Sequence, residues 1–227
     1  MNILVCHGGS FIELKMNRLP KMIIKAKHHW FLYPFFKLYS RWMPARNFSK
    51  VQIHYSFKDA GLPMLMLGNH ISWWDGFLAQ YVNIELFNRK LHIMMLEEQL
   101  EKRMFLNKTG AYSIKKGDRS AVESLRYSSD LLKDPNNLVI LFPQGKIHSM
   151  FDFPVTFEKG WYRIVSNLEG PVQVVFFITL YDYFSSSKPQ LNIYLYNYTY
   201  KGKSLEEMNT DFNNCLSESI EIQKSMA

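Results

Sequence analysis

Residues 62–76, LPMLMLGNHISWWDG, set the pattern of the chain. The apolar run at 62–67 has the length expected of a strand that is buried on both faces. Polar residues follow it directly, and the spacing of apolar residues from Gly76 to Leu86 then favours a helix. A buried strand, a polar loop and a helix in this order are typical of one unit of an α/β domain with a parallel sheet.

The alternation continues on both sides of this stretch. We predict further strands at 51–57, 91–96, 111–114, 138–142 and 172–180, and a late strand at 191–198 that could add to an edge of the sheet. We predict further helices at about 97–110, 118–132 and 158–168, and a C-terminal helix that begins at a capping box of Ser204 and Glu207. The expected fold is α/β, with a mostly parallel sheet, helices on both faces, and a ligand site beyond the carboxyl ends of the strands.

A basic, aromatic segment precedes this domain. Residues 14–58 include ten Lys or Arg and no acid, and seven aromatic residues lie between Trp30 and Trp42. We predict a basic amphipathic helical arm bracketed by Pro20 and Pro44 and kinked near Pro34, where the amide donor is missing. This composition is typical of a helix in the lipid headgroup region, with its Lys and Arg side chains extended toward water.

The arm has three interpretations. A membrane surface is the first candidate partner, single-stranded nucleic acid is the rival, and the third is a helix that packs its aromatic side chains on its own domain. We expect a lipid surface and no nucleic acid. We therefore divide the chain into residues 1–49, a membrane-associating arm, and residues 50–227, the α/β domain.

Composition narrows the cellular setting. The two cysteines, Cys6 and Cys215, lie at opposite ends of the chain, which excludes a disulfide framework and a multi-cysteine zinc site. The longest stretch free of charged residues, Ala60 to Trp74, has 15 residues, whereas a membrane-spanning helix needs about 20. The first residues lack the basic and apolar regions of a secretory signal. We expect a peripheral or monotopic protein at the cytoplasmic face of a membrane.

The polar residues that could take part in a reaction lie in two loops that follow apolar strands, at 68–75 and at 142–146. In the first loop His70 can titrate near neutral pH, and Asp75 could accept a hydrogen bond from its Nδ1 atom. The Nε2 atom would then be free to take a proton as a general base. The alternative is a structural histidine at a strand end, because an H-x4-D spacing is weak evidence by itself.

Five segments in order extend the pattern: GNHISWWDG at 68–76, TGAYSIKKGDRSAVESLRYSSDLLKD at 109–134, LVILFPQGKIHS at 138–149, FEKG at 157–160 and GPVQVVFFI at 170–178. Together they resemble the glycerolphosphate and lysophosphatidic-acid acyltransferase family. That family has an N-H-x4-D loop, a G-x-x-x-I-x-R segment that leads into a helix, an F-P-E-G-T-R-S motif, and an apolar strand introduced by proline. The resemblance covers roughly residues 62–180, about half of the chain.

The resemblance implies transfer of a fatty acyl group from a thioester, acyl-CoA or acyl carrier protein, directly to a hydroxyl group of a lysolipid. His70 would be the general base and Asp75 would orient it. The matching positions for substrate binding are Asn69, Lys115, Lys116, Arg119, Pro143, Gln144, Gly145 and Lys146. The residues agree with direct transfer, because the chain has no G-x-S-x-G nucleophile motif and neither cysteine has a motif partner. We expect no cofactor and no metal, since metal-ligand, P-loop and dinucleotide patterns are absent from the sequence.

Three departures from the family pattern bear on the acceptor. Gln144 stands where the family has glutamate, and Lys146 and Ile147 stand where it has threonine and arginine. In the second motif Lys115 and Lys116 replace an aspartate–arginine pair, with Arg119 three residues further on. Lysine attracts a phosphate as a point charge but cannot clamp it in bidentate fashion. A 1-acylglycerol-3-phosphate-like acceptor is the first expectation. The alternatives are a different lipid, such as an amino-acid lipid or a pigment, and a non-catalytic lipid-binding module.

Overall fold

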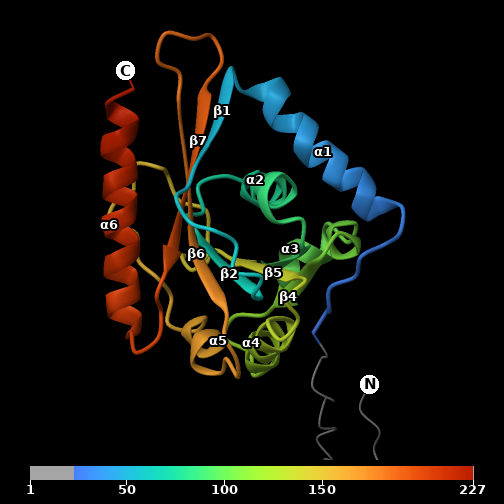
Figure 1. Ribbon diagram of the computed structural model, residues 1–227. Coiled ribbons are helices and arrows are strands. Elements are labelled where there is room, and N and C mark those ends of the chain that lie inside the picture. Colours follow the sequence, from blue (N-terminus) through green and yellow to red (C-terminus); the bar gives the residue numbers. More distant parts are fainter. Residues whose placement is uncertain (1–22, 227) are drawn as a thin grey trace, which may run out of the picture.

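The computed structural model describes residues 23–226 as an α/β fold built on one seven-stranded sheet (Figure 1). The strands are β1 (Lys50–His54), β2 (Met64–Gly68), β3 (Lys90–Leu96), β4 (Ala111–Ile114), β5 (Asn137–Leu141), β6 (Gln173–Asp182) and β7 (Gln190–Tyr198). Their order in the sheet is β1-β7-β6-β2-β5-β3-β4. All neighbouring pairs are parallel except β6 and β7, which are antiparallel. The predicted fold class is confirmed.

Helices cover both faces of the sheet. The α-helices are α1 (Leu32–Asn47), α2 (Asp75–Val82), α3 (Glu97–Glu101), α4 (Ser120–Leu131), α5 (Tyr162–Ser166) and α6 (Leu205–Lys224), and a π-helical segment, η1 (Asn83–Phe87), and a short 3-10 helix, η2 (Leu106–Lys108), complete the set. Figure 1 shows α6 along one side of the sheet and α1 and α2 on the other. No helix within residues 23–226 is long and apolar enough to cross a membrane.

The central strand β2 explains why its sequence is apolar at every position. Leu65 and Leu67 pack into the core under α4, α5 and α6, whereas Met64 and Met66 pack into the core under α1 and α2. Successive side chains of a strand point to opposite faces, so a strand with helices on both sides has no polar face. The sheet therefore has two apolar cores, and the edge where its parallel strands end is left for polar loops.

Every predicted strand is present, with small differences at its ends. One expectation about their order was wrong: β7 is not an edge strand, because β1 pairs with it in parallel on its outer side. The helices differ more. The segment expected as a helix at about 97–110 contains only the short helix α3 and the 3-10 helix η2, and the segment at 158–168 contains only the short helix α5. The capping box at Ser204 is confirmed, since its hydroxyl accepts the amide of Glu207 and the Glu207 carboxylate accepts the amide of Ser204.

The N-terminal helix begins later than predicted. Pro20 lies outside the described residues, and residues 23–31 are not helical because they pair with another segment. The Lys27 amide donates to the Asn107 carbonyl, and the Gly110 amide donates to the Lys27 carbonyl. The helix α1 starts at Leu32, so Pro34 falls in its first turn, where no amide donor is needed, and Pro44 lies inside it.

The helix α1 divides its aromatic residues between two surroundings. Phe36 and Tyr39 contact Phe77 of α2, and Met43 is part of the core beneath. Phe35, Leu38 and Trp42 of α1 are exposed instead, and so are Trp30 and Phe31 just before the helix. The interpretation in which the helix packs on its own domain is thus correct for one face, while the other face is apolar and uncovered.

Candidate active site

The two polar loops meet at the carboxyl end of the sheet because the strands before them are neighbours. Strands β2 and β5 pair in parallel, so the loop after Gly68 and the turn after Leu141 lie side by side. The His70 ring stacks on the Phe142 ring with centroids 4.4 Å apart. The His148 amide donates to the His70 carbonyl at 2.9 Å. His70, Phe142 and His148 therefore lie together beyond the carboxyl ends of β2 and β5, where the ligand site was expected.

His70 and Asp75 form a hydrogen-bonded pair at the end of β2. The Nδ1 atom of His70 lies 2.8 Å from Oδ2 of Asp75, and the same oxygen accepts the amides of Ile71 and Ser72, each at 2.9 Å. A carboxylate can only accept, so Nδ1 donates and Nε2 is the ring nitrogen left to act as a base. The Asp75 side chain is fully buried at the start of α2, whereas that of His70 is 23% exposed and lines a cavity.

Burial shapes the electrostatics of this pair. It raises the pKa of the Asp75 carboxyl, and the hydrogen bonds from His70, Ser72 and Ile71 partly oppose that rise. The other carboxylate oxygen, Oδ1, is buried without a hydrogen-bond partner in the described residues. Burial therefore makes the ionised carboxylate less favourable in free energy, and a positive charge on the imidazole would stabilise it.

Gln144 has a role that its position in the motif does not reveal. It is buried, and its side-chain oxygen accepts the His70 amide at 2.5 Å. The turn that carries it is closed by the Gly145 amide, which donates to the Phe142 carbonyl at 2.9 Å. The Gly145 amide is thus engaged within its own turn, and the predicted contact of Gly145 with substrate stays a prediction. Gly145 has φ +70°, which is a backbone conformation that favours glycine.

Asn69 is turned toward the sheet. Its side-chain nitrogen donates to the Thr179 carbonyl and its side-chain oxygen accepts the Thr179 amide, both at 2.9 Å. These bonds tie the loop before His70 to β6, and Asn69 is not part of the cavity wall. The structure therefore gives it a positioning role next to His70, and its predicted contact with substrate stays a prediction.

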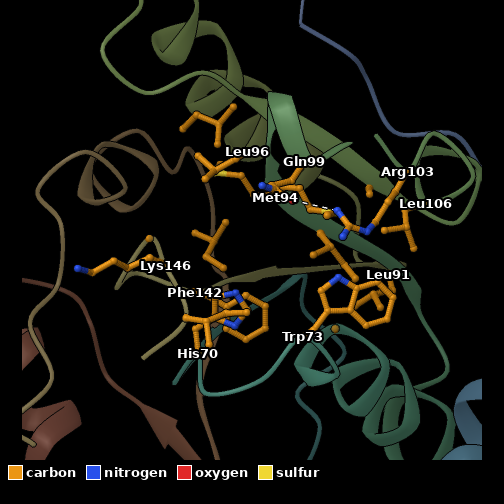
Figure 2. Close-up of a pocket in the computed structure, with 18 of the residues that line it drawn as sticks. His70, Trp73, Leu91, Met94, Leu96, Gln99, Arg103, Leu106, Phe142 and Lys146 are labelled. Carbon is orange, nitrogen blue, oxygen red and sulfur yellow. Dashed lines mark hydrogen bonds between the residues drawn. The ribbon is translucent and has the colours of Figure 1, made fainter. Parts of the chain in front are cut away.

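Of the four predicted cationic residues, Lys116 and Lys146 line the cavity, and Lys115 and Arg119 do not. Lys116 lines it, but its ammonium group is 2.6 Å from the Glu158 carboxylate and 2.9 Å from the Gly145 carbonyl. Lys115 lies 3.6 Å from Asp118, and Arg119 is exposed where α4 begins. Lys146 lines the cavity together with Pro143, and Figure 2 shows its ammonium end directed away from His70. Glu158 belongs to the FEKG segment, and its ion pair with Lys116 could not be predicted from a single acidic residue in a loop.

The cavity beside His70 has a volume of about 640 Å³ and a mostly apolar wall. Figure 2 shows His70 and Phe142 on one side of it and Trp73, Leu91 and Leu106 on another. Arg103 also faces it, with its guanidinium group 5.8 Å from the Trp73 ring and bonded to the Gln99 side chain at 2.9 Å. Sequence reasoning missed Arg103 and Gln99, because they lie in a segment with no motif. A chamber of this size and lining suits a long apolar chain.

Comparison with known proteins identifies the family. A family model described as Acyltransferase matches residues 47–178, which is more than half of the chain and includes His70, Asp75 and the turn after β5. The chain belongs to the acyltransferase family. It is an acyltransferase enzyme by this membership, and the resemblance drawn from the five segments is confirmed.

A solved structure shows the same fold in another acyltransferase. The 1-acyl-sn-glycerophosphate (LPA) acyltransferase PlsC of Thermotoga maritima aligns with a TM-score of 0.56 and 18% identity, over 83% of this chain and 78% of that one. The comparison with curated protein sequences finds no match. Among residues 23–226 of this acyltransferase, no group of three or more His, Cys, Asp or Glu side chains is placed to hold a metal ion. The absence of a cofactor stays a prediction.

Proposed function

We propose that this acyltransferase moves a fatty acyl group from an acyl thioester, acyl-CoA or acyl carrier protein, to a hydroxyl group of a lysolipid. The observation that carries the proposal is the His70–Asp75 pair at 2.8 Å, with its carboxylate buried and its imidazole at the wall of an apolar cavity. Family membership supports acyl transfer to a lipid, and the geometry supports His70 as the base.

In the proposed reaction the acceptor hydroxyl attacks the thioester carbonyl while Nε2 of His70 takes its proton. The C–O bond forms, the C–S bond breaks, and the leaving thiolate takes the proton from the His70 imidazolium, which regenerates the neutral base. The buried Asp75 carboxylate stabilises the imidazolium that forms, because it carries the opposite charge and is hydrogen-bonded to the ring. No covalent acyl-enzyme is required.

We propose that the uncovered face of α1 rests on the cytoplasmic surface of a membrane. Phe31, Phe35, Leu38 and Trp42 repeat at helical spacing and are exposed, and Trp30 just before the helix is 82% exposed. Lys37 and Arg46 on the same helix supply positive charge that anionic headgroups attract, whereas Arg41 is paired with Glu85 at 3.2 Å. We name Trp30, Phe31, Phe35, Leu38 and Trp42 the apolar stripe of α1.

The helix that carries the apolar stripe also contributes Phe36 to the cavity wall. Phe36, on the opposite face of α1, stacks on Phe105 and contacts Phe77, which in turn contacts both Trp73 and Trp74. Trp73, Trp74, Met104 and Phe105 each remain 40% exposed or more. A membrane under this surface would bring lipid substrates to the cavity without passage through water.

The proposed acceptor is a 1-acylglycerol-3-phosphate-like lysolipid, with a non-glycerophosphate lipid such as an amino-acid lipid or a pigment as the second candidate. Lys116 and Lys146 in the cavity wall favour an anionic acceptor. The Lys116–Glu158 ion pair favours the second candidate, because it neutralises one of the lysines that line the cavity.

An acceptor panel tests the proposal. Labelled palmitoyl-CoA and palmitoyl acyl carrier protein are incubated with vesicles that contain lysophosphatidic acid, its dephosphorylated analogue or a lyso-amino-acid lipid. We expect transfer to lysophosphatidic acid to exceed transfer to the dephosphorylated analogue by at least about tenfold, because a charge-assisted contact is lost in the analogue. Equal transfer to the two would contradict a phosphate-dependent acceptor, and no transfer from either donor to any acceptor would contradict the proposed reaction.

A further inference from the structure

Arg103 places a guanidinium group in the wall of the cavity. It follows α3 in a turn with a fixed backbone, because its amide donates to the Leu100 carbonyl and its carbonyl accepts the Leu106 amide, both at 2.9 Å. Leu100 is fully buried, which anchors this turn in the core. The Arg103 side chain is only partly buried and lines the cavity, and Figure 2 shows it on the opposite side from Lys146. A ligand in the cavity can therefore reach it.

The groups that hold the Arg103 side chain are neutral. Its Nη1 atom donates to the Gln99 side-chain oxygen at 2.9 Å, and the guanidinium carbon lies 5.8 Å from the centre of the Trp73 ring, which is within cation–π range. The ion pairs among residues 23–226 do not include Arg103. A guanidinium group offers N–H donors on every nitrogen, and Gln99 is the acceptor found for them in the described part of the chain. The edge formed by Nε and Nη2 is thus left for a ligand.

The other cations of the described cavity wall are less suited to an anion. Lys116 is paired with Glu158 at 2.6 Å, and Figure 2 shows the ammonium end of Lys146 directed away from the histidine. Lys37 donates to a neutral side-chain amide at 3.0 Å. A positive charge against an apolar wall is stabilised by an anion, since burial without a partner is unfavourable in free energy. Arg103 is therefore the cation of this wall best placed to meet an anion inside the cavity.

Exposed apolar side chains border the turn that carries Arg103. Met104 and Phe105 follow it directly and are 45% and 40% exposed, and Trp73 is 41% exposed. Phe105 also stacks on Phe36 of α1, the helix with the apolar stripe. Arg103 thus lies between an exposed apolar surface and an apolar cavity. A lipid whose fatty chain enters the cavity from that surface would bring its charged headgroup to this border.

We propose that Arg103 binds the phosphate of the lysolipid acceptor and supplies the bidentate contact that the turn after β5 lacks. The planar fork of a guanidinium group matches two oxygens of a phosphate, whereas lysine acts as a point charge. Lys146 and Ile147 stand at the motif positions of that turn, so the turn itself offers no such fork. The bond to Gln99 holds the fork in one orientation. The inference rests on the proposed function, since it assigns the residue that recognises the acceptor.

The donor is a second source of the same chemistry, because coenzyme A carries phosphate groups on its nucleotide. We expect the acceptor to be the source, since Arg103 borders the exposed apolar surface from which a lipid would enter. Separate binding measurements with the two molecules distinguish these sources.

Calorimetric titration tests the inference without catalysis. The full chain is titrated with lauroyl lysophosphatidic acid, with its dephosphorylated analogue and with coenzyme A, and no acyl donor is present. We expect the phosphorylated lipid to bind at least about tenfold more tightly than the analogue, because a charge-assisted bidentate contact is lost in the analogue. Arg103→Gln should remove this preference, Arg103→Lys should keep only part of it, and binding of coenzyme A should be the same in all three proteins.

The matched control is Lys102→Gln. Lys102 is an exposed cation next to Arg103 that does not line the cavity, so its loss changes the net charge equally and should leave the preference intact. Melting temperatures are measured for every variant. Arg103→Gln should unfold within roughly a few degrees of the wild type, because the side chain is partly exposed and makes no ion pair with the described residues.

Four results would overturn the inference. They are equal binding of the two lipids by the wild type, a preference that survives Arg103→Gln, an equal loss of preference in Lys102→Gln, and a loss of coenzyme A binding in Arg103→Gln in place of lipid binding. A large drop in the melting temperature of both Arg103 variants would also overturn it, because the guanidinium group would then be structural.

The binding result is independent of the proposed reaction. Acyl transfer to lysophosphatidic acid without a preference that depends on Arg103 contradicts this inference alone. A preference that depends on Arg103, with no transfer from any donor, contradicts the proposed function alone.

Discussion

At the scale of single residues, the site depends on what holds His70 in place. Its ring is bonded to Asp75 and stacked on Phe142, its amide is held by Gln144, and its carbonyl is held by the His148 amide. The pairing of His70 with Asp75 could be predicted from their spacing in a loop after a strand. The bond from Gln144 could not, because it joins a side chain to the backbone of a loop 74 residues away.

Asp75→Asn separates catalysis from stability. Loss of the carboxylate removes the group that stabilises the imidazolium, so we expect kcat to fall by about 10²–10⁴-fold. The melting temperature should stay the same or rise, because burial raises the pKa of this carboxyl and the ionised form is therefore held at a cost at neutral pH. Acyl transfer and thermal unfolding of the two proteins check both parts. Unchanged kcat would contradict the role given to Asp75.

Gln144 is expected to act by positioning the loop. Gln144→Glu keeps an oxygen that can accept the His70 amide and should retain most of the activity, whereas Gln144→Ala should lower kcat by about tenfold through a displaced imidazole. The control is the pH profile of kcat, which should keep its shape in Gln144→Glu. Equal activity of the alanine and glutamate variants would show that the bond does not matter.

At the scale of elements, α1 shows where sequence reasoning succeeds and where it stops. The basic, aromatic composition predicted a helix with an apolar face, and α1 has one. The start of the helix was misplaced because residues 23–31 form backbone hydrogen bonds with residues around Asn107 and Gly110, a tertiary contact that no local pattern records. The same limit applies to the short helices α3 and α5. Leu100 of α3 and Ile164 of α5 are fully buried, although little regular helix surrounds them.

The apolar stripe of α1 gives a prediction about membrane binding. Phe31→Ser, Phe35→Ser and Leu38→Ser together should weaken binding to anionic vesicles by at least about tenfold, because exposed apolar area is the driving force for insertion into the headgroup region. The melting temperature should be unchanged within a few degrees, since these side chains contact little else. Co-sedimentation with vesicles and thermal unfolding measure the two effects.

The matched control lies on the opposite face of α1. Phe36→Ser removes a side chain that packs on Phe77 and Phe105, so it should lower the melting temperature before it affects vesicle binding. Vesicle binding by the stripe variant at the wild-type level would contradict the proposed docking face.

At the scale of the whole molecule, the sheet brings together residues that are far apart in the sequence. Parallel pairing of β2 with β5 joins the two motif loops, and β6 on the other side of β2 holds Asn69. The presence of these strands could be predicted from apolar runs, and the family resemblance indicated the site. The order of the strands could not be predicted, because the position of β7 between β1 and β6 depends on pairing between distant segments.

The core also makes folding stability depend on pH through His92. Burial, with a contribution from the neighbouring His28, lowers its pKa from 6.5 to about 4. Between these values the unfolded chain binds a proton that the folded chain does not, so stability falls as pH falls through this window. The lowered pKa of His92 alone should reduce the free energy of unfolding by about 2 kcal/mol between pH 7 and pH 5. Urea unfolding of the wild type and His92→Gln at both pH values measures the difference, and the same pH dependence in both proteins would contradict this account.

The most direct test of the central claim is acyl transfer by His70→Ala beside the wild type. Both proteins are given a labelled acyl thioester and lysolipid vesicles, and their melting temperatures are measured in parallel. We predict a loss of about 10²–10⁴-fold in transfer with a melting temperature within a few degrees, because His70 is a partly exposed loop residue that acts as the base. Transfer at the wild-type rate by the folded variant would contradict the account.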